Sequence, residues 1–272
     1  MVIRQDEQTM IHLSEINAVL IETTAAYVSS YLLSELANAS IPVLFCGLEH
    51  SPIGQYLPLY GAHDSSRRVR EQVSWSDSVK GEIWRQIVRS KILNQASVLR
   101  ACSLPQASML EEYASDVRFD DETNREGHAA KVYFNALFGT GFSREQENPV
   151  NARLNYGYAI LLAWLNREIT IRGYLTQLGI HHCNDYNSFN LACDFMEPFR
   201  PVIDWCVLQD SDAELSPSTK IELVSLFDQH HTFNDGNYRL SSIIGLFAKT
   251  NLAILSERQP LTSYLDFTFH AD

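Results

Sequence analysis

The pattern of secondary-structure signals changes near residue 61, and this change limits the folds open to the chain. The first 60 residues hold short β-type runs, such as 18–21 and 41–46, separated by polar turns. After Gly61, apolar residues recur at helical spacing almost without interruption. The sequence therefore predicts an α+β fold, in which a small N-terminal β-rich domain (1–62) precedes a larger all-α domain (63–272) that opens with a linker (63–75).

The expected elements of the N-terminal domain are one helix and several strands. Thr23 or Thr24 can cap a helix that runs through Ala39, with Val28, Leu32, Leu33 and Leu36 on one face. The proline in 56–60 makes that run an edge strand. The remaining strands are expected at 2–4, 10–13, 18–21 and 41–46.

In the helical domain, Ser76 and Asp77 begin the most regular segment, which extends to about Ala101 and turns Val79, Ile83, Ile87 and Val88 toward the core. Another helix is expected to begin at Asn124. The others are expected at 154–175, 189–207, 218–227 and 240–255.

Composition excludes several classes of protein. No apolar run approaches the roughly 20 residues that cross a bilayer, and the N-terminal residues MVIRQDEQTM lack the apolar segment of a signal peptide. We therefore expect a cytoplasmic protein with no membrane partner. The five cysteines are scattered and form no C-x-x-C pair, so we expect free thiols rather than disulfides or a zinc ribbon.

The net charge of −12 is unevenly distributed. Residues 1–62 carry a net charge of −5, whereas residues 63–105 carry +4. A nucleic-acid binder needs Lys and Arg to neutralise phosphates, so the basic segment is the best local candidate for DNA contacts, although a solvated helix face explains it equally well. Its candidate residues are Arg67, Arg68, Arg70, Arg85 and Arg89.

The first unusual acid is Glu126. At helical spacing it shares a face with Ala129, Tyr133 and Leu137, which makes it the polar start of a core-facing stripe. An unpaired carboxylate there is costly, so it requires a cation, a hydrogen-bond network or a metal. The alternative is an acid in the first helical turn that suits the helix dipole and stays in solvent.

A second unusual stretch lies between His181 and Pro201. Asn190, Asp194 and Glu197 follow one another at spacings of four and three, and Pro198 removes a backbone donor beside them. Such departures from local rules are commoner at functional sites than elsewhere. The alternative is an ordinary solvated acidic face preceded by a histidine.

Two carboxylates and an imidazole together suit Mg²⁺ or Mn²⁺, with positions left for water and substrate oxygens. A phosphodiester is the natural substrate for such an ion. The chain contains no P-loop, G-x-S-x-G, H-E-x-x-H or G-x-G-x-x-G motif, which disfavours Walker-type nucleotide hydrolysis and serine acyl transfer.

The sequence also resembles a known family. The strings N-R-E-G-H-A-A around Glu126, N-Y-G-Y at 155–158 and D-F-M-E-P-F-R-P from Asp194 resemble the integrase of CRISPR adaptation modules. Further strings at 60–66, at 75–76 and at 91–95 (K-I-L-N-Q) are similar to its type II-A branch, so the resemblance covers nearly the whole chain.

The resemblance implies roles for particular residues. Glu126, His182 and Glu197 would be the catalytic metal ligands, and His182 is preferred to His181 because it keeps the family spacing to Glu197. Asp194, Arg125 and Arg200 would support the site. His230 and His231 match no motif of the family and are expected at the surface.

The resemblance further implies that the chain is an integrase. The 3′-hydroxyl of a foreign DNA fragment (the prespacer) would attack a phosphodiester of the CRISPR repeat, in double-stranded DNA, by direct transesterification. The N-terminal domain would form a homodimer, and dimers would flank a small ferredoxin-fold partner. Type II-A relatives also work with a ring-forming accessory protein and the RNA-guided effector nuclease.

Members of the family usually begin with a further β-hairpin before the segment that resembles Val2–Ile3, and this chain shows none there. We therefore expect an incomplete N-terminal sheet, with consequences for dimer geometry and partner docking. Two other functions stay open from the sequence: a general metal-dependent nuclease that trims branched DNA, and a DNA-binding scaffold without catalysis.

Overall fold

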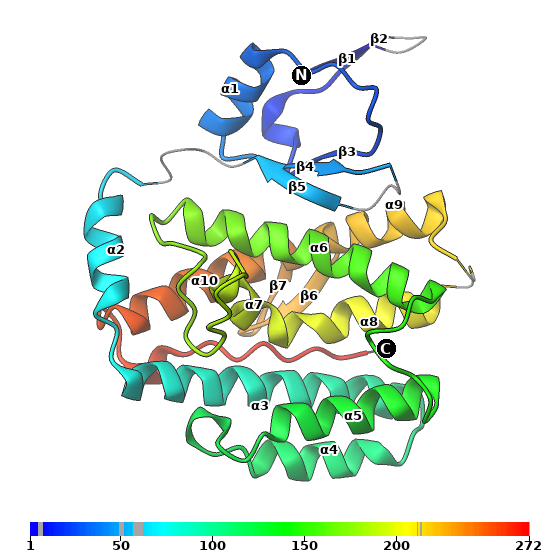
Figure 1. Ribbon diagram of the computed structural model, residues 1–272, viewed down its shortest axis with the longest axis vertical. Helices are drawn as coiled ribbons and strands as arrows, with labels where there is room; N and C mark the ends of the chain where they lie inside the picture. Colours follow the sequence, from blue (N-terminus) through cyan, green and yellow to red (C-terminus); the bar gives the residue numbers. More distant parts are fainter. Residues whose placement is uncertain (5–7, 49–51, 57–61, 211, 213, 272) are drawn as a thin grey trace.

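The computed structural model describes residues 1–4, 8–48, 52–56, 62–210, 212 and 214–271. A small N-terminal part with short strands lies against one side of a larger helical part (Figure 1). This arrangement confirms the predicted α+β fold class, with its β-rich part first. The exact domain boundary at residue 62 stays a prediction.

The N-terminal part contains two small sheets. The first pairs β1 and β2 antiparallel, and the second has the order β3-β4-β5, with β3 parallel to β4 and β5 antiparallel to it. Leu36, Ile41 and Val43 form a separate small apolar cluster there. The elements are β1 (Val2–Arg4), β2 (Gln8–Met10), the 3-10 helix η1 (Leu13–Glu15), β3 (Val19–Ile21), α1 (Ser30–Asn38), β4 (Val43–Cys46) and β5 (Pro52–Tyr56).

The helical part is built around two long helices. The 25-residue α3 (Asp77–Ala101) packs against α4 and α5 on one side and against η3 and α8 on another, while α6 (Pro149–Thr170) contacts β5 and α7 to α10 (Figure 1). The other elements are α2 (Ser65–Val73), α4 (Gln106–Ser115), η2 (Phe119–Asp121), α5 (Arg125–Phe138), α7 (Asn190–Met196), η3 (Glu197–Phe199), α8 (Arg200–Gln209), α9 (Pro217–Ser225), η4 (Leu226–Asp228), β6 (His230–Phe233), β7 (Gly236–Arg239), α10 (Leu240–Leu255) and η5 (Leu261–Ser263).

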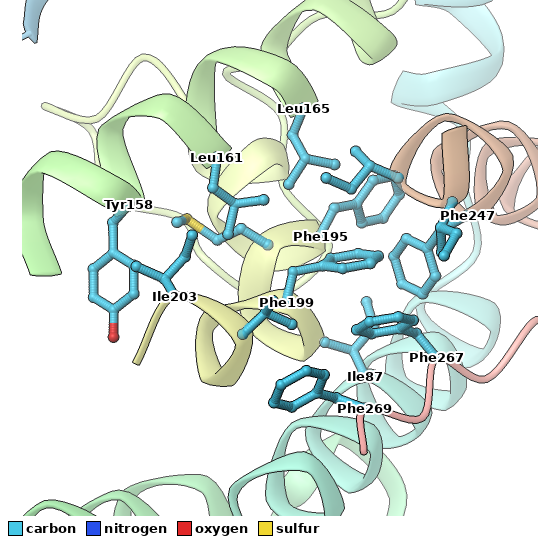
Figure 2. Packing of buried hydrophobic residues seen from close by; sticks show 14 of the residues in the cluster. Ile87, Tyr158, Leu161, Leu165, Phe195, Phe199, Ile203, Phe247, Phe267 and Phe269 are labelled. Atoms are coloured by element: carbon cyan, nitrogen blue, oxygen red, sulfur yellow. The ribbon is translucent and has the colours of Figure 1, made fainter. Parts of the chain in front are cut away.

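Aromatic packing holds the short α7-η3-α8 segment between the long helices (Figure 2). Phe199 stacks on Phe267 of the C-terminal segment with ring centroids 4.6 Å apart, and meets Phe247 of α10 edge-on at 5.2 Å. All three side chains are fully buried. Each such side chain stabilises the fold by about 2 kcal/mol. The turn that carries Glu197 is therefore placed by a rigid core rather than by a loop.

Several predicted helices are confirmed. Ser76 caps α3, which ends at Ala101, and Ile83, Ile87 and Val88 are fully buried on it, while Val79 is half-buried. The helix expected at 240–255 is α10. The predicted disturbance at Pro198 is also present, because α7 gives way to η3 and α8 there.

The boundaries of two helices, α1 and α6, were predicted wrongly. Helix α1 begins at Ser30, with the Ser29 side chain accepting from the backbone N–H of Leu32, rather than after Thr23 or Thr24. Residues 23–27 are all exposed, so a helix there would have no apolar surface to pack against, and Val28 lies outside α1.

Helix α6 begins earlier and ends earlier than the predicted 154–175. The Asn148 side chain accepts from the N–H of Asn151, and Pro149 occupies the first helical turn, a position that proline favours. Gly173 has φ +82°, a left-handed backbone that does not continue a helix.

The helical domain is not entirely α-helical. Strands β6 and β7 form a hairpin whose turn residues Asn234 and Asp235 both have positive φ. The sequence N-D-G is a typical signal for such a turn, and it was overlooked. His230 on β6 is exposed as predicted, whereas His231 is half-buried.

Other segments also differ from expectation. The run 10–13 forms the end of β2 and the start of η1 instead of one strand, and most of the predicted linker 63–75 is helix α2. Helix α4 was not predicted. The expected edge strand 56–60 lies outside the described residues apart from Tyr56, which ends β5.

The cysteines and the hydropathy of the helices complete the description of the fold. All five cysteines are free thiols. Among the described residues, no helix combines the length and apolarity needed to cross a membrane.

Candidate active site

Glu126 is held at the first turn of α5 by a tight capping arrangement. The Asp121 carboxylate accepts hydrogen bonds from the backbone N–H groups of Arg125 (2.8 Å) and Glu126 (2.9 Å). The Asn124 side chain accepts from the N–H of Gly127. Asp121 and Asn124 have positive φ, which Asp and Asn tolerate better than most residues. These bonds satisfy the free donors of the helix end and fix where Glu126 starts.

Glu126 and Glu197 meet at a single buried cation, Lys91 of α3. Its Nζ lies 2.5 Å from Glu126 Oε1 and 2.5 Å from Glu197 Oε2. Burial alone would lower the pKa of Lys91, but the charges of Glu197 and Glu126 outweigh it and raise the pKa. Two predicted ligands, 71 residues apart in the sequence, thus lie on either side of one ammonium group.

Glu197 is an ionised carboxylate in the protein interior. Its second oxygen, Oε1, accepts from Arg200 Nε at 2.9 Å. Burial would raise the pKa of Glu197, but Arg200 and Lys91 lower it to about 2. Asn94 of α3 donates to the carbonyl of Pro198 at 2.8 Å, which anchors this turn. The site therefore keeps Glu197 as an anion.

His182 is oriented by Asp194, a fully buried carboxylate. Asp194 Oδ1 lies 2.7 Å from His182 Nδ1 and accepts from the His182 N–H, while Oδ2 accepts from the N–H of Ile180. The hydrogen bond to Asp194 raises the pKa of His182. With Nδ1 bound to Asp194, Nε2 is the nitrogen left for a metal or a substrate.

The loop that carries His182 passes very close to Asp194. A Cβ at Gly179 would lie 2.3 Å from the carbonyl oxygen of His182 and 2.7 Å from Asp194 Oδ2. Only glycine allows this approach. Trp84 packs against both histidines. Its ring stacks on that of His181, with centroids 4.3 Å apart, and meets the ring of His182 edge-on, with centroids 5.7 Å apart.

The site opens to solvent on the His182 side. The His182 side chain is 38% exposed and that of Glu126 is 25% exposed, whereas that of Glu197 is 3% exposed. A cavity of about 500 Å³ borders His182. Its lining includes Gln72, Lys80, Cys183, Asn184 and Asn190. A substrate can reach His182 from this side.

The donor types fit a divalent cation, although the described side chains do not yet surround one. Among the described residues, no three His, Cys, Asp or Glu side chains converge with metal-ligand geometry. Glu197 Oε2 is buried and accepts no hydrogen bond of normal geometry from any described residue, despite the nearby ammonium. A buried anionic oxygen in contact with an ammonium group suits a metal ion as well, and a metal bound by both glutamates would compete with Lys91 for the same place.

A second buried carboxylate, Asp204, lies seven residues after Glu197 in the sequence. It accepts a hydrogen bond from the hydroxyl of Tyr158 on α6. Burial raises the pKa of Asp204 to about 6. Arg200 stacks on the same Tyr158 ring with its Cζ 4.6 Å from the centroid, so this cluster adjoins the Glu197 site.

The predicted supporting residues divide into two groups. Asp194 and Arg200 contact the predicted ligands His182 and Glu197 directly. Arg125 instead pairs with Asp116 at 3.3 Å and lies over the Tyr113 ring, at 5.1 Å from its centroid. Its side chain serves the α4–α5 packing.

The predicted DNA-binding arginines come from α2 and α3, and most are already paired with acids. Arg67 and Arg68 contact Glu71 on α2 and Asp64, the residue that precedes this helix. Arg85 pairs with Glu82, and Arg89 with Asp266. Arg70 is exposed and has no ion pair with a described residue. None of the five bonds to Glu126, His182 or Glu197 in the described part of the chain.

Sequence reasoning missed the role of Lys91. It was noticed only within a string that resembles the integrase family. A local signal was available, because Lys91 follows Ile87 by four residues and precedes Gln95 by four on the buried face of α3. A lysine on such a face requires an anionic partner, by the argument that singled out Glu126.

Comparison with known proteins identifies relatives over most of the chain. The family model described as CRISPR associated protein Cas1 matches residues 1–213. The CRISPR-associated endonuclease Cas1 of Neisseria meningitidis serogroup C (strain 8013) is 40% identical over 224 residues, which cover 80% of this chain and 74% of that protein. The CRISPR-associated endonuclease Cas1 1 of Thermus thermophilus is 31% identical over 189 residues, which cover 64% and 58%.

Solved structures share the fold at lower identity. A casposase bound to integration product has a TM-score of 0.76 and 18% identity, covering 94% of this chain and 82% of that chain. A Cas6-RT-Cas1–Cas2 complex has a TM-score of 0.73 and 19% identity, covering 98% of this chain and 34% of that chain.

Proposed function

This chain belongs to the CRISPR-associated Cas1 family, and from that premise we propose that it is the DNA integrase and endonuclease of CRISPR spacer acquisition. Its relatives are named as endonucleases, and a casposase of the same fold was solved with an integration product. Assignment to the type II-A branch stays part of the proposal.

We propose Glu126, His182 and Glu197 as ligands of a divalent cation, either Mg²⁺ or Mn²⁺. The observation that carries this proposal is the convergence of Glu126 and Glu197 on one cation position, with 2.5 Å from each carboxylate to the same ammonium nitrogen. The Asp194–His182 pair supports it, because ligating histidines usually donate their other ring N–H to a carboxylate or carbonyl.

The proposed reaction is attack of a 3′-hydroxyl on a phosphodiester of the CRISPR repeat. A new phosphodiester forms as the old one breaks, and the displaced strand leaves with its own 3′-hydroxyl. When bound, the cation would supply positive charge against the scissile phosphate.

The protein's own groups would prepare this reaction by holding geometry. Arg200 keeps the Glu197 carboxylate in one orientation, and Asp194 holds the His182 ring. Asp121 fixes the start of α5 and with it Glu126. Preorganised groups of this kind reduce the reorganisation that accompanies the transition state.

We propose double-stranded DNA, both prespacer and repeat, as substrate and a Cas2-type ferredoxin-fold protein as partner. Similar proteins were solved in complex with an integration product and with Cas2. From the sequence resemblance, the proposal also includes a homodimer, the ring-forming accessory protein and the effector nuclease. From the composition, it includes a cytoplasmic location. The effect of the N-terminal strands on dimer geometry is open to the same tests.

The test is an integration assay with the purified chain and its Cas2-type partner. It uses Mn²⁺ or Mg²⁺, a supercoiled plasmid that carries the repeat, and a labelled duplex with free 3′-hydroxyls. We expect label to join the plasmid, and this joining to be lost in Glu126→Ala, His182→Ala and Glu197→Ala. Arg125→Ala is the matched control, because Arg125 faces Asp116 rather than the site.

Other outcomes would select the alternative functions. Plasmid that is cut without joining would favour a general metal-dependent nuclease, a function consistent with the endonuclease names of the relatives. DNA binding that is equally strong with Glu197→Ala and gives no metal-dependent product would favour a scaffold.

A further inference from the structure

The proposed metal site already contains a cation supplied by the chain. The Lys91 side chain is 8% exposed and comes from the middle of α3, where its neighbours on the helix are buried. An ammonium group there is stable only beside anions. Lys91 has two such partners, the carboxylates of Glu126 on α5 and Glu197 on η3, each with an oxygen 2.5 Å from Nζ.

The two carboxylates depend on Lys91 to different degrees. Glu197 has a second cationic partner in Arg200, which binds its other oxygen. For Glu126, Lys91 is the only ion-pair partner among the described residues. Without Lys91, Glu197 Oε2 would be a buried anionic oxygen with no cation in contact, and Glu126 would lose its neutralising charge.

A bound divalent ion and the Lys91 ammonium cannot occupy the same place. Glu126 and Glu197 would hold a divalent ion through carboxylate oxygens, at about 2.0–2.1 Å for Mg²⁺, and the space between these two carboxylates now contains Nζ. Two positive charges at such short separation also repel each other strongly in the protein interior. Metal binding at these oxygens requires the ammonium to move away from at least one of them.

We infer that Lys91 is a positioning residue that holds Glu126 and Glu197 together in the metal-free enzyme and competes with the divalent cation for their oxygens. It keeps the two proposed ligands in place before the metal arrives, and it weakens metal binding because it must be displaced. This inference rests on the proposed metal site and goes beyond it, since it concerns the metal-free protein.

Two measurements on the full chain test this inference. Titration calorimetry gives the Mn²⁺ affinity, and thermal unfolding with and without Mn²⁺ gives the unfolding temperature of each state. In Lys91→Met, which keeps the length of the side chain and removes its charge, we expect Mn²⁺ to bind at least about tenfold more tightly. The metal-free variant should unfold at a lower temperature than wild type, and Mn²⁺ should raise that temperature more than it does in wild type.

Lys131→Met is the matched control, because Lys131 is an exposed lysine on α5, the helix of Glu126. It makes the same change in charge and should leave the Mn²⁺ affinity unchanged. A purely structural role for Lys91 predicts lower stability in both states with an unchanged or weaker Mn²⁺ affinity, and that result would overturn the inference.

The outcomes separate this inference from the proposed function. If wild type binds Mn²⁺ and Glu197→Gln does not, the metal site stands, and equal affinity in Lys91→Met refutes the competition alone. If neither wild type nor Lys91→Met binds Mn²⁺, the metal site and the inference fail together.

A second variant covers the case in which Lys91→Met does not fold. Lys91→Gln keeps a hydrogen-bond donor for the carboxylates without the charge, and the same affinity gain is expected. If both variants are recovered only when Mn²⁺ is present during purification, the ion replaces the ammonium as inferred. If neither is recovered even then, the ion cannot do so and the inference is wrong.

Discussion

Glu197 and Asp204 are two buried carboxylates on one continuous stretch of chain, η3 followed by α8, and their pKa values are shifted in opposite directions. Glu197 contacts Lys91 and Arg200, and its pKa is lowered to about 2. Asp204 instead accepts from the Tyr158 hydroxyl, and burial raises its pKa to about 6. Burial is almost the same for both, at 3% and 1% exposure.

The difference shows that contact with a cation, rather than depth in the protein, decides in which direction the pKa of a buried acid shifts. Desolvation disfavours both carboxylates, and only the ammonium and guanidinium groups in contact with Glu197 reverse it. An anion kept in this way is suited to receive a metal ion. Asp204, whose direct partner is a neutral hydroxyl, is suited to join α6 to α8.

The largest expected effect separates the two acids by activity. We predict that Glu197→Gln lowers the integration rate at least about 100-fold, since it removes a proposed ligand, and even changes outside the ligand set cost about 10–100-fold. Asp204→Asn should keep a rate near that of wild type. The measurement is the initial rate of label joining in the integration assay. Equal losses in the two variants would mean that the Asp204 cluster takes part in the chemistry.

The next prediction concerns Asp194, the third buried acid of the region. Asp194→Asn should weaken Mn²⁺ binding about 10–100-fold, because the ring of His182 loses the carboxylate that orients it. Calorimetric titration of the purified variant measures this affinity. The control is Asp116→Asn, whose carboxylate contacts Arg125 at a surface position. An unchanged affinity in Asp194→Asn would argue against His182 as a ligand.

The pH dependence of stability sharpens the contrast between Glu197 and Asp204. The pKa of folded Asp204 is about 6, above its ordinary value of 3.8, so its stabilising contribution is complete below pH 3.8 and is lost as the pH rises to 6. Glu197 behaves oppositely, since its contribution is present above its ordinary pKa of 4.5 and is lost as the pH falls toward 2.

We therefore predict that the unfolding free energy of wild type, relative to Asp204→Asn, decreases by up to about 3 kcal/mol between pH 4 and pH 7. Denaturant unfolding of both proteins at a series of pH values measures it. A difference that does not vary with pH would show that Asp204 keeps one protonation state across this range.

The smallest expected effect applies the same comparison to the arginines. Arg70 has no acidic partner among the described residues, whereas Arg85 pairs with Glu82. Arg70→Gln should reduce the slope of log affinity for DNA against log salt by about one unit, while Arg85→Gln should change it less. Filter binding at several salt concentrations measures the slope. Equal slopes in wild type and Arg70→Gln would remove Arg70 from the proposed DNA interface.

The sequence determined the elements whose signals are local. Ser76 and Asp77 mark the start of α3, apolar spacing marks α10, and Pro198 marks the break between α7 and α8. The capping and periodicity that define such elements involve residues a few positions apart, so they can be read directly. The resemblance to the integrase family, later supported by the family match, also came from short strings of sequence.

Only the tertiary structure decided how the proposed ligands are held. Contacts between segments remote in sequence show that Lys91 of α3 neutralises both Glu126 and Glu197 and that Asp194 orients His182. They also show that the Arg125 side chain pairs with Asp116 rather than with the proposed ligands. The boundary of α1 was likewise decided by which residues find apolar surface to cover. These properties depend on the distances between groups remote in sequence and on their burial, and neither quantity is encoded in local spacing.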